Sequence, residues 1–173
     1  PTDDGDFNPF SIREIRYAVN FLVDRNLIVN ELLGGYGTPM ISNFGIFSAD
    51  YLGVVDVLES FEFRYNPNLA NKIITEQLQD NGAKKISDTW YYDDEPIVVT
   101  LFIRSDDPAR KAIGEILSSN LESIGFTVEK EYGDLNKAFV LVYGSDPAEQ
   151  KWHLYTEGWG SSGFSRYDSI ALA

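Results

Sequence analysis

Apolar side chains recur at helical spacing in three separate stretches of the chain. Hydrophobic residues three and four positions apart fall on one face of a helix, and polar residues occupy the opposite face. The three sets are Ile12, Ile15, Ala18, Val19, Leu22 and Val23; Leu69, Ala70, Ile73, Ile74 and Leu78; and Ala109, Ile113, Ile116, Leu117, Leu121 and Ile124. This spacing predicts three amphipathic helices, each with one buried face.

Residues that favour helix ends flank these stretches. Ser11 and Glu14 have the spacing of a capping box, in which the hydroxyl accepts a hydrogen bond from a free backbone amide. The pair Asn66–Pro67 places a capping residue before a proline at the first helical position. Gly82 and Gly125 follow the second and third stretches, and glycine ends helices because it enters the left-handed conformation without a steric cost.

A further helical segment is predicted after Asp24, which can cap a turn that ends at the pair Gly34–Gly35. Residues 36–63 interleave glycine and proline with aromatic residues, which predicts a long loop with a short helix near 51–58. Loops of this length in compact domains are often functional.

The apolar pattern changes in the second half of the chain. Residues 97–103 form a nearly continuous β-branched apolar run, which is typical of a central strand covered on both faces. Residues 126–132 alternate and predict a second strand, so strand, helix and strand form a βαβ unit with a parallel pair. Residues 84–95 predict a turn or a hairpin arm, and residues 152–159 predict a further strand. The fold class is α/β, with a small, mostly parallel sheet flanked by helices.

The charge balance narrows the choice of partners. Lys and Arg total 14 and Asp and Glu total 27, which gives a net charge of −13. Binders of nucleic acid or of anionic membranes draw affinity from clustered basic residues, so we expect neither kind of partner. The absence of cysteine excludes disulfides, thiolate metal sites and cysteine nucleophiles.

The chain contains no apolar run near the ~20 residues of a membrane-spanning helix, and no signal-peptide pattern. It starts at Pro1 rather than at Met. We therefore expect a fragment of a longer protein, whose export signal lies outside it.

Residues that could carry catalysis are sparse. The only histidine is His153, and no Gly-x-Ser-x-Gly motif accompanies it, so a partly exposed strand histidine is the simpler interpretation. One histidine without cysteine also argues against a metal site, and phosphate-binding and dinucleotide-binding glycine motifs are absent. Carboxylates cluster at Asp3–Asp4, 93–95 and Asp106–Asp107, in positions typical of turns and helix caps. We predict no catalytic residue, no metal site and no cofactor.

Aromatic residues make up 14% of the chain, and several fall in or beside predicted loops. These are Tyr36, Phe44, Trp90, Tyr91, Tyr92, Trp152 and Trp159. Clefts that bind peptides and sugars use such rings, because a ring face buries a large area for few frozen torsions. Core packing is the alternative for each of them.

The order of several motifs resembles a known family. The helix motif Arg16-x-Ala18-Val-Asn20 running into Asp24–Arg25 is similar to a signature of the family 5 extracellular solute-binding proteins, the peptide and nickel receptors of ABC importers. The turn 33–39, the helix start 65–70 and the pair Gly158–Trp159 resemble later motifs of the same family, in the same order.

This resemblance implies one lobe of a type II periplasmic-binding-protein-like fold. Residues 10–159 would form the solute-binding lobe, residues 1–9 a linker, and residues 160–173 a tail leading back to the missing lobe. The family traps a peptide, oligosaccharide or metal chelate by hinge closure and passes it to ABC permease subunits. It implies an extracellular or periplasmic location at the cell surface. Trp159, Tyr36 and Phe44 are the candidate ligand-binding residues.

The sequence leaves the ligand class and two alternative functions open. Residues 132–152 follow a longer route than in many bacterial members, which leaves the ligand class undecided. An acidic adhesion or interaction domain without a transporter would explain the charge and the aromatic residues but not the ordered motifs. An α/β hydrolase would require the carboxylate clusters to converge in a pocket.

Overall fold

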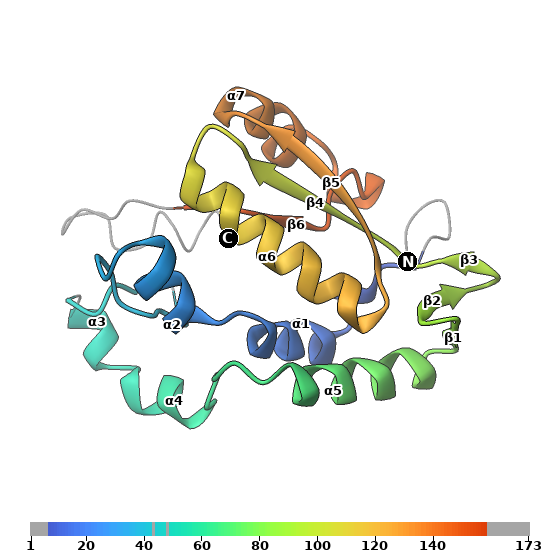
Figure 1. The fold of residues 1–173 in the computed structure, drawn as a ribbon, viewed down its shortest axis with the longest axis horizontal. Helices are drawn as coiled ribbons and strands as arrows, with labels where there is room; N and C mark the ends of the chain where they lie inside the picture. Colours follow the sequence, from blue (N-terminus) through green and yellow to red (C-terminus); the bar gives the residue numbers. More distant parts are fainter. Residues whose placement is uncertain (1–6, 43, 48, 159–173) are drawn as a thin grey trace. The chain divides into compact units, whose positions relative to one another are not determined.

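The structure is a computed structural model that describes residues 7–42, 44–47 and 49–158 (Figure 1). Its contacts divide the chain into two compact units. Residues 7–23 and 65–156 belong to the first unit, and residues 24–64, 157 and 158 belong to the second.

Most of the regular structure lies in the first unit. Its elements, with η for a 3₁₀ or π turn, are η1 (Pro9–Ser11), α1 (Arg13–Val19), η2 (Asn20–Leu22), α5 (Pro67–Asp80), β1 (Lys84–Ile86), β2 (Thr89–Tyr92), β3 (Glu95–Pro96), β4 (Val98–Arg104), α6 (Pro108–Ile124), β5 (Thr127–Gly133), α7 (Leu135–Ala138), η4 (Phe139–Tyr143), η5 (Pro147–Glu149) and β6 (Leu154–Tyr155). The second unit contains α2 (Arg25–Leu27), η3 (Ile28–Leu32), α3 (Ala49–Leu52) and α4 (Val55–Ser60). Within the described ranges, none of these helices has both the length and the apolar character needed to cross a membrane.

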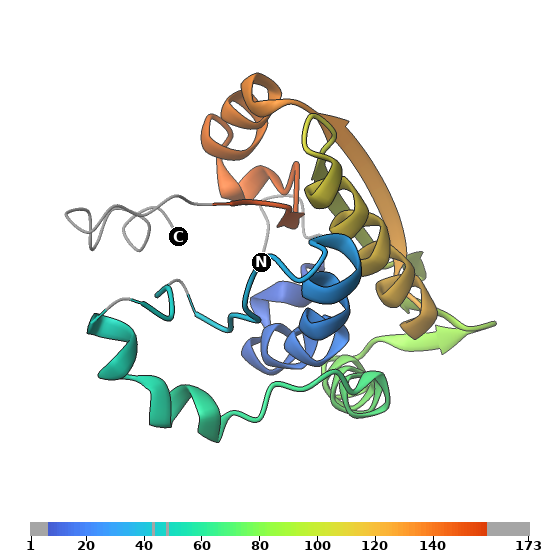
Figure 2. The ribbon, with the colours of Figure 1, turned by 60° about the vertical axis from the view of Figure 1, so that its left-hand side comes forward.

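A three-stranded parallel sheet with the order β5-β4-β6 organises the first unit. The pair β4–β5 is in register from Val98 opposite Thr127 to Arg104 opposite Gly133. Helix α6 connects these two strands and lies against them, as Figure 2 shows. The predicted βαβ unit and the central position of residues 97–103 are therefore confirmed.

The two faces of β4 meet different neighbours, because side chains alternate along a strand. Ile103 packs onto Gly114 of α6, where a hydrogen replaces a side chain. Phe102, on the opposite face, lies against Tyr155 of β6, with the ring centroids 5.4 Å apart. Leu101, Phe102 and Ile103 are completely buried, so both faces of the strand contribute to the core.

The ends of α6 agree with the sequence. The side chain of Asp107 accepts hydrogen bonds from the backbone amides of Ala109 and Arg110, and Gly125 ends the helix in the left-handed conformation at φ +112°. The indole Nε1 of Trp90 donates to the carbonyl of Ile124 at 3.1 Å. Trp90 is completely buried, so its grouping with the loop aromatics was wrong: it occupies β2 and satisfies a carbonyl at the end of α6.

Residues 84–96 form the predicted hairpin arm as a small antiparallel sheet, β1-β2-β3. Both of its turns have two central residues with positive φ, Ser87–Asp88 and Asp93–Asp94. Positive φ at both central positions defines the type I′ turn that suits two-residue hairpins.

Helices α1 and α5 lie side by side beneath α6 (Figure 1). Their completely buried residues belong to the predicted stripes: Ile15 and Ala18 in α1, and Ala70, Ile74 and Leu78 in α5. A side-chain hydrogen bond of 2.8 Å from Asn120 to the carbonyl of Leu22 connects α6 to η2. The helical pattern therefore correctly predicted the buried faces.

One predicted cap is wrong. The hydroxyl of Ser11 donates to the carbonyl of Asn8 at 2.8 Å, and the residue before α1 is Ile12, which makes no side-chain capping bond. The chain turns earlier than expected, because Asn8 caps η1 and Pro9 begins it. The Asn66 cap is confirmed, since its side chain accepts from the amide of Leu69 at 3.1 Å.

In the second unit, the predicted helix cap and the predicted glycine end are both confirmed. Asp24 accepts from the amide of Leu27 at 3.0 Å, and Gly34 and Gly35 both have positive φ. The region 36–63 contains two short helices, α3 and α4, where the sequence predicted one.

The single histidine connects β6 to β4 through two hydrogen bonds. His153 donates its backbone amide to the carbonyl of Thr100 at 2.8 Å, and its ring Nδ1 accepts from the amide of Thr100 at 2.9 Å. The ring Nε2 lies 3.2 Å from Oε1 of Gln150. Because Nδ1 is an acceptor, the imidazole is neutral with its proton on Nε2. Burial lowers the pKa of His153, which also favours the neutral ring.

We expect the substitution Gly114→Ala to destabilise the protein. An added Cβ would lie 2.8 Å from two side-chain atoms of Ile103. Overpacking outweighs the gain in helix propensity, so the free energy of unfolding should fall by roughly 1–2 kcal/mol in urea denaturation. Ser119→Ala, at an exposed position of the same helix, is the control and should change it by less than about 0.5 kcal/mol. A Gly114→Ala variant as stable as the wild type would contradict this packing.

Acid should weaken the β4–β6 junction through His153. A lowered folded pKa means that the folded state binds fewer protons, so its stabilising contribution is complete above the ordinary histidine pKa of about 6.5. It is lost as the pH falls from there through the lowered folded pKa. His153→Asn keeps an acceptor for Thr100 but cannot titrate. Urea midpoints measured between pH 7.5 and pH 5 should therefore fall more steeply for the wild type than for the variant, and equal slopes would refute the assignment.

Candidate functional site

The connections of the parallel sheet identify the carboxyl ends of β4 and β6, the switch-point edge, as the candidate site. From β4 the chain crosses to β5 on one side and then returns to β6 on the other side. The boundary between β4 and β6 is therefore a topological switch point. In open α/β sheets, ligands bind outside the carboxyl ends of the strands at such a point.

Arg104, the last residue of β4, occupies this edge. Its Nε and Nη2 donate to the two carboxylate oxygens of Asp106, at 2.7 and 2.8 Å. Its Nη1 donates to the hydroxyl of Tyr155 at 3.3 Å, across the switch point. The arginine side chain is only 8% exposed, whereas that of Asp106 is 37% exposed. A guanidinium is thus held rigidly at the edge by groups from both sides.

Arg104 and Asp106 each shift the pKa of the other toward the charged form. The hydrogen bonds from Arg104 lower the pKa of the Asp106 carboxyl. The bonds to Asp106 and then to Tyr155 raise the pKa of Arg104. Both groups stay charged, and the edge carries a balanced ion pair rather than a free cation.

Thr156 prolongs the contact beyond the two-residue strand β6. Its amide donates to the carbonyl of Phe102 at 3.1 Å, and its hydroxyl accepts from the amide of Arg104 at 2.9 Å. Thr156 is buried. These bonds hold the neighbouring Tyr155 against β4.

Tyr155 of β6 and two rings of η4, Tyr143 and Phe139, form a row of aromatic contacts at the edge. Tyr143 lies edge-on to Tyr155 with the centroids 6.4 Å apart, and Phe139 lies 5.6 Å from Tyr143. The exposed fractions are 57% for Phe139 and 40% for Tyr143. The edge therefore presents accessible rings next to a fixed ion pair, a combination that can hold a ligand by ring contacts and hydrogen bonds.

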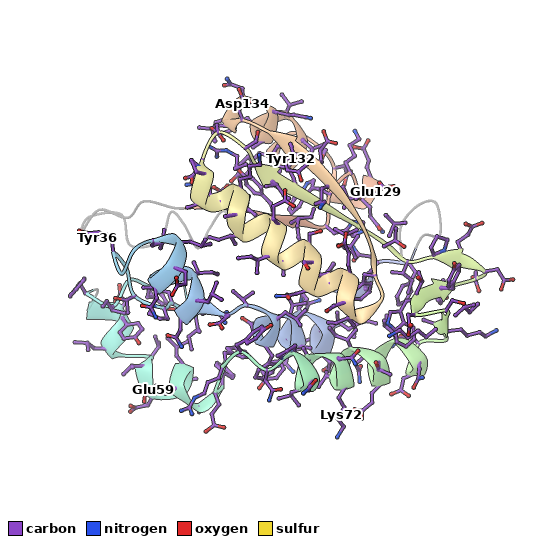
Figure 3. The ribbon with its side chains drawn as sticks, in the orientation of Figure 1. Tyr36, Glu59, Lys72, Glu129, Tyr132 and Asp134 are labelled. Carbon is purple, nitrogen blue, oxygen red and sulfur yellow. The ribbon has the colours of Figure 1, made fainter. Side chains whose placement is uncertain are left out.

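The carboxyl end of β5 borders the same edge. Figure 3 labels Tyr132 and Asp134 there. The hydroxyl of Tyr132 donates to Glu115 of α6 at 2.5 Å, and Asp134 caps α7 by accepting from the amide of Lys137 at 2.9 Å. Both polar groups therefore have structural partners in α6 and α7.

The described carboxylate clusters also have local roles. Asp106 pairs with Arg104, Asp107 caps α6, and Asp93–Asp94 form a turn. Asp3–Asp4 lies outside the described residues. In the part of the chain that the structure describes, no group of three or more His, Asp or Glu residues could hold a metal ion.

Of the three ligand-binding residues predicted from the sequence, the structure describes Tyr36 and Phe44. Tyr36 belongs to the second unit and is 91% exposed (Figure 3). Phe44 is in the same unit, is half-buried and donates its amide to the hydroxyl of Ser42 at 3.2 Å. Trp159 lies outside the described residues. All three remain predictions.

Sequence reasoning missed the residues of the switch-point edge. Arg104 directly follows the apolar run of β4, and Asp106 comes two residues later. A charged residue at the carboxyl end of a predicted parallel strand was the available signal. The pairing with Tyr155, fifty-one positions along the chain, had no such signal.

Comparison with known proteins agrees with this fold. The sequence model described as "Bacterial extracellular solute-binding proteins, family 5 Middle" matches residues 4–172. No curated protein matches the chain.

Several solved structures are similar to the chain. The oligopeptide-binding protein AppA from Bacillus subtilis, in complex with a nonapeptide, has a TM-score of 0.72 at 24% identity, over 92% of this chain and 30% of AppA. NikA from Brucella suis, in complex with Fe(III)-EDTA, has a TM-score of 0.65 at 18% identity, over 94% of this chain and 30% of NikA. A mannohexaose-bound periplasmic oligopeptide-binding protein from Thermotoga maritima has a TM-score of 0.60 at 22% identity, over 78% and 25% of the two chains.

The chain thus spans about a third or less of the length of these relatives. The structural likeness confirms the predicted periplasmic-binding-protein type of α/β fold, and the sequence match covers nearly the whole chain. The chain belongs to the family 5 bacterial extracellular solute-binding proteins.

Proposed function

We propose that the protein captures a solute outside the cell for an ABC importer, and that this chain supplies one lobe of a two-lobe receptor. The observation that carries the proposal is the switch-point edge, where Arg104, Tyr155 and Tyr143 meet at the carboxyl ends of the sheet. Membership of a family of binding proteins supports it.

The share of the relatives that the chain spans supports the lobe assignment. A single lobe offers one wall of a cleft, and the remainder of the receptor would supply the opposite wall. Ligand contacts that exist only in the closed state would drive hinge closure. In this proposal residues 10–159 are the lobe, residues 1–9 a linker and residues 160–173 the return to the other lobe.

The ligand would contact the accessible rings of the edge and the polar atoms around Arg104. Trp159, Tyr36 and Phe44 stay the ligand-binding candidates proposed from the sequence. Catalysis is not part of the proposal, since the family is one of binding proteins and the described carboxylates serve as caps, turns and ion pairs.

The relatives indicate which solutes to test. Their structures contain a nonapeptide, a metal chelate or mannohexaose, so peptides, chelated metals and oligosaccharides are the candidate classes here. The proposed location is extracellular or periplasmic, with ABC permease subunits as partners. A net charge of −13 favours solubility in such a medium.

A ligand screen tests the function directly. The full-length receptor is expected to gain thermal stability with one of the three solute classes, because a ligand that binds only the folded state raises the unfolding midpoint. At a ligand concentration of 100 times Kd the stabilisation should be about 2.7 kcal/mol. Differential scanning fluorimetry measures it, with each ligand's solvent as the blank. No shift with any class at millimolar concentration would contradict the proposal.

The variant Tyr143→Ser tests the location of the ligand. Losing an exposed ring that contacts ligand should weaken binding of the screened solute by about tenfold, with little effect on folding. Tyr17→Ser is the matched control, since Tyr17 is 38% exposed and Tyr143 40% exposed, but Tyr17 lies on α1. Isothermal titration calorimetry measures both affinities. Equal affinity of the two variants for the solute would show that the solute does not bind at the switch-point edge.

A further inference from the structure

A cavity lies at the opposite end of β4 from the switch-point edge. Its volume is about 500 Å³, within the range of small-ligand sites. Its lining residues all belong to the first unit and include Phe7, Tyr92, Asp93, Glu95, Thr100 and His153. Val98 and Arg104 are six residues apart on β4, so roughly 20 Å of strand separates the cavity from the ion pair.

The charge of this cavity is entirely negative. Its lining contains three carboxylates, Asp93, Glu95 and Glu149, and no lysine or arginine. Glu149 is paired with Lys151 at 2.6 Å. Asp93 and Glu95 form no ion pair with another described residue. Both residues are exposed to solvent, and they lack the counter-charge that Arg104 gives to Asp106 at the other end.

Aromatic rings form a second, independent feature. Phe7 and Tyr92 stack with their centroids 4.5 Å apart and an angle of 20° between the rings. Pro96, Ile97 and Val98 add apolar surface beside them. Ring faces attract ammonium groups, and apolar walls hold the carbon atoms attached to them.

The polar lining residues His153, Gln150 and Thr100 add no positive charge to the cavity. His153 is neutral, because its Nδ1 accepts from the amide of Thr100, and its Nε2 lies next to Gln150. The lining carboxylates also belong to no metal-binding cluster among the described residues. The cavity therefore offers a negative potential, ring faces and apolar walls, but no ligand set for a metal ion.

We infer that this cavity binds a small organic ammonium ion with a short apolar body, such as a primary alkylamine, at a site separate from the solute-binding edge. The ammonium group lies near Asp93 and Glu95, and the carbon chain lies against Phe7, Tyr92 and the apolar wall. Neutral molecules of the same shape lack the charge attraction and bind more weakly. The site does not depend on which solute the edge takes.

The test uses n-butylammonium and n-butanol, which have the same carbon chain with and without the charge. The full-length protein carries nitrogen-15-labelled threonine, and the amide signal of Thr100 reports on the cavity floor. At low ionic strength the ammonium ion should shift this signal in a saturable way. Asp93→Asn and Glu95→Gln should each weaken its binding by about fivefold, the effect of one charge pair of ~1 kcal/mol at 4 Å in water.

The matched control is Asp94→Asn, which removes the neighbouring charge of the same turn but not a lining residue. It should change the affinity by less than twofold, as should Tyr143→Ser at the other end of the sheet. An equal response to n-butanol, no shift with either probe, or an equal loss in Asp94→Asn would each overturn the inference. A negative ligand screen at the edge would leave this result unaffected, so the two proposals fail separately.

Discussion

The pairing of β4 with a parallel strand on each side is the constraint on which the first unit depends. Seven residues of β4 are in register with β5, and His153 and Thr156 prolong the pairing with the short β6 through backbone and side-chain bonds. A strand whose two faces are both covered by packed elements is apolar on both, because neither face is left to solvent. The buried run of β4 meets this requirement and positions α6, the edge and the cavity.

The two ends of this strand differ in their electrostatics. At the carboxyl end, Arg104 and Asp106 neutralise each other, and Tyr155 joins them across the switch point. At the amino end, Asp93 and Glu95 have no described cationic partner, and the one ring that could become positive, His153, is held neutral. The chain has a net charge of −13, but the total charge does not reveal that one end of β4 is balanced and the other is not.

Local patterns predicted the elements well where a short-range physical cause determines them. The stripes of α1 and α5, the caps Asn66 and Asp107 and the end at Gly125 depend on neighbours within one helical turn. The stripe of α6 was predicted only in part, because Gly114 and Ser118 share its buried face with Leu121 and Ile124. Ser11 failed as a cap because Asn8 and Pro9 compete for the same turn. Trp90 was misplaced because its buried state depends on the carbonyl of Ile124, which is thirty-four positions away. The ring by itself does not distinguish a core residue from a cleft residue.

The sequence by itself determined the α/β class, the βαβ unit and the family, because periodicity, caps and ordered motifs act over short distances and remain visible in one dimension. Only the tertiary structure decided that β6 pairs with β4 opposite β5, and so placed the switch point. It also brought Arg104 to Tyr155 and gathered Phe7, Tyr92, Glu95 and His153 around one cavity. Such sites join residues from distant segments, and their energy arises from contacts that no local pattern encodes.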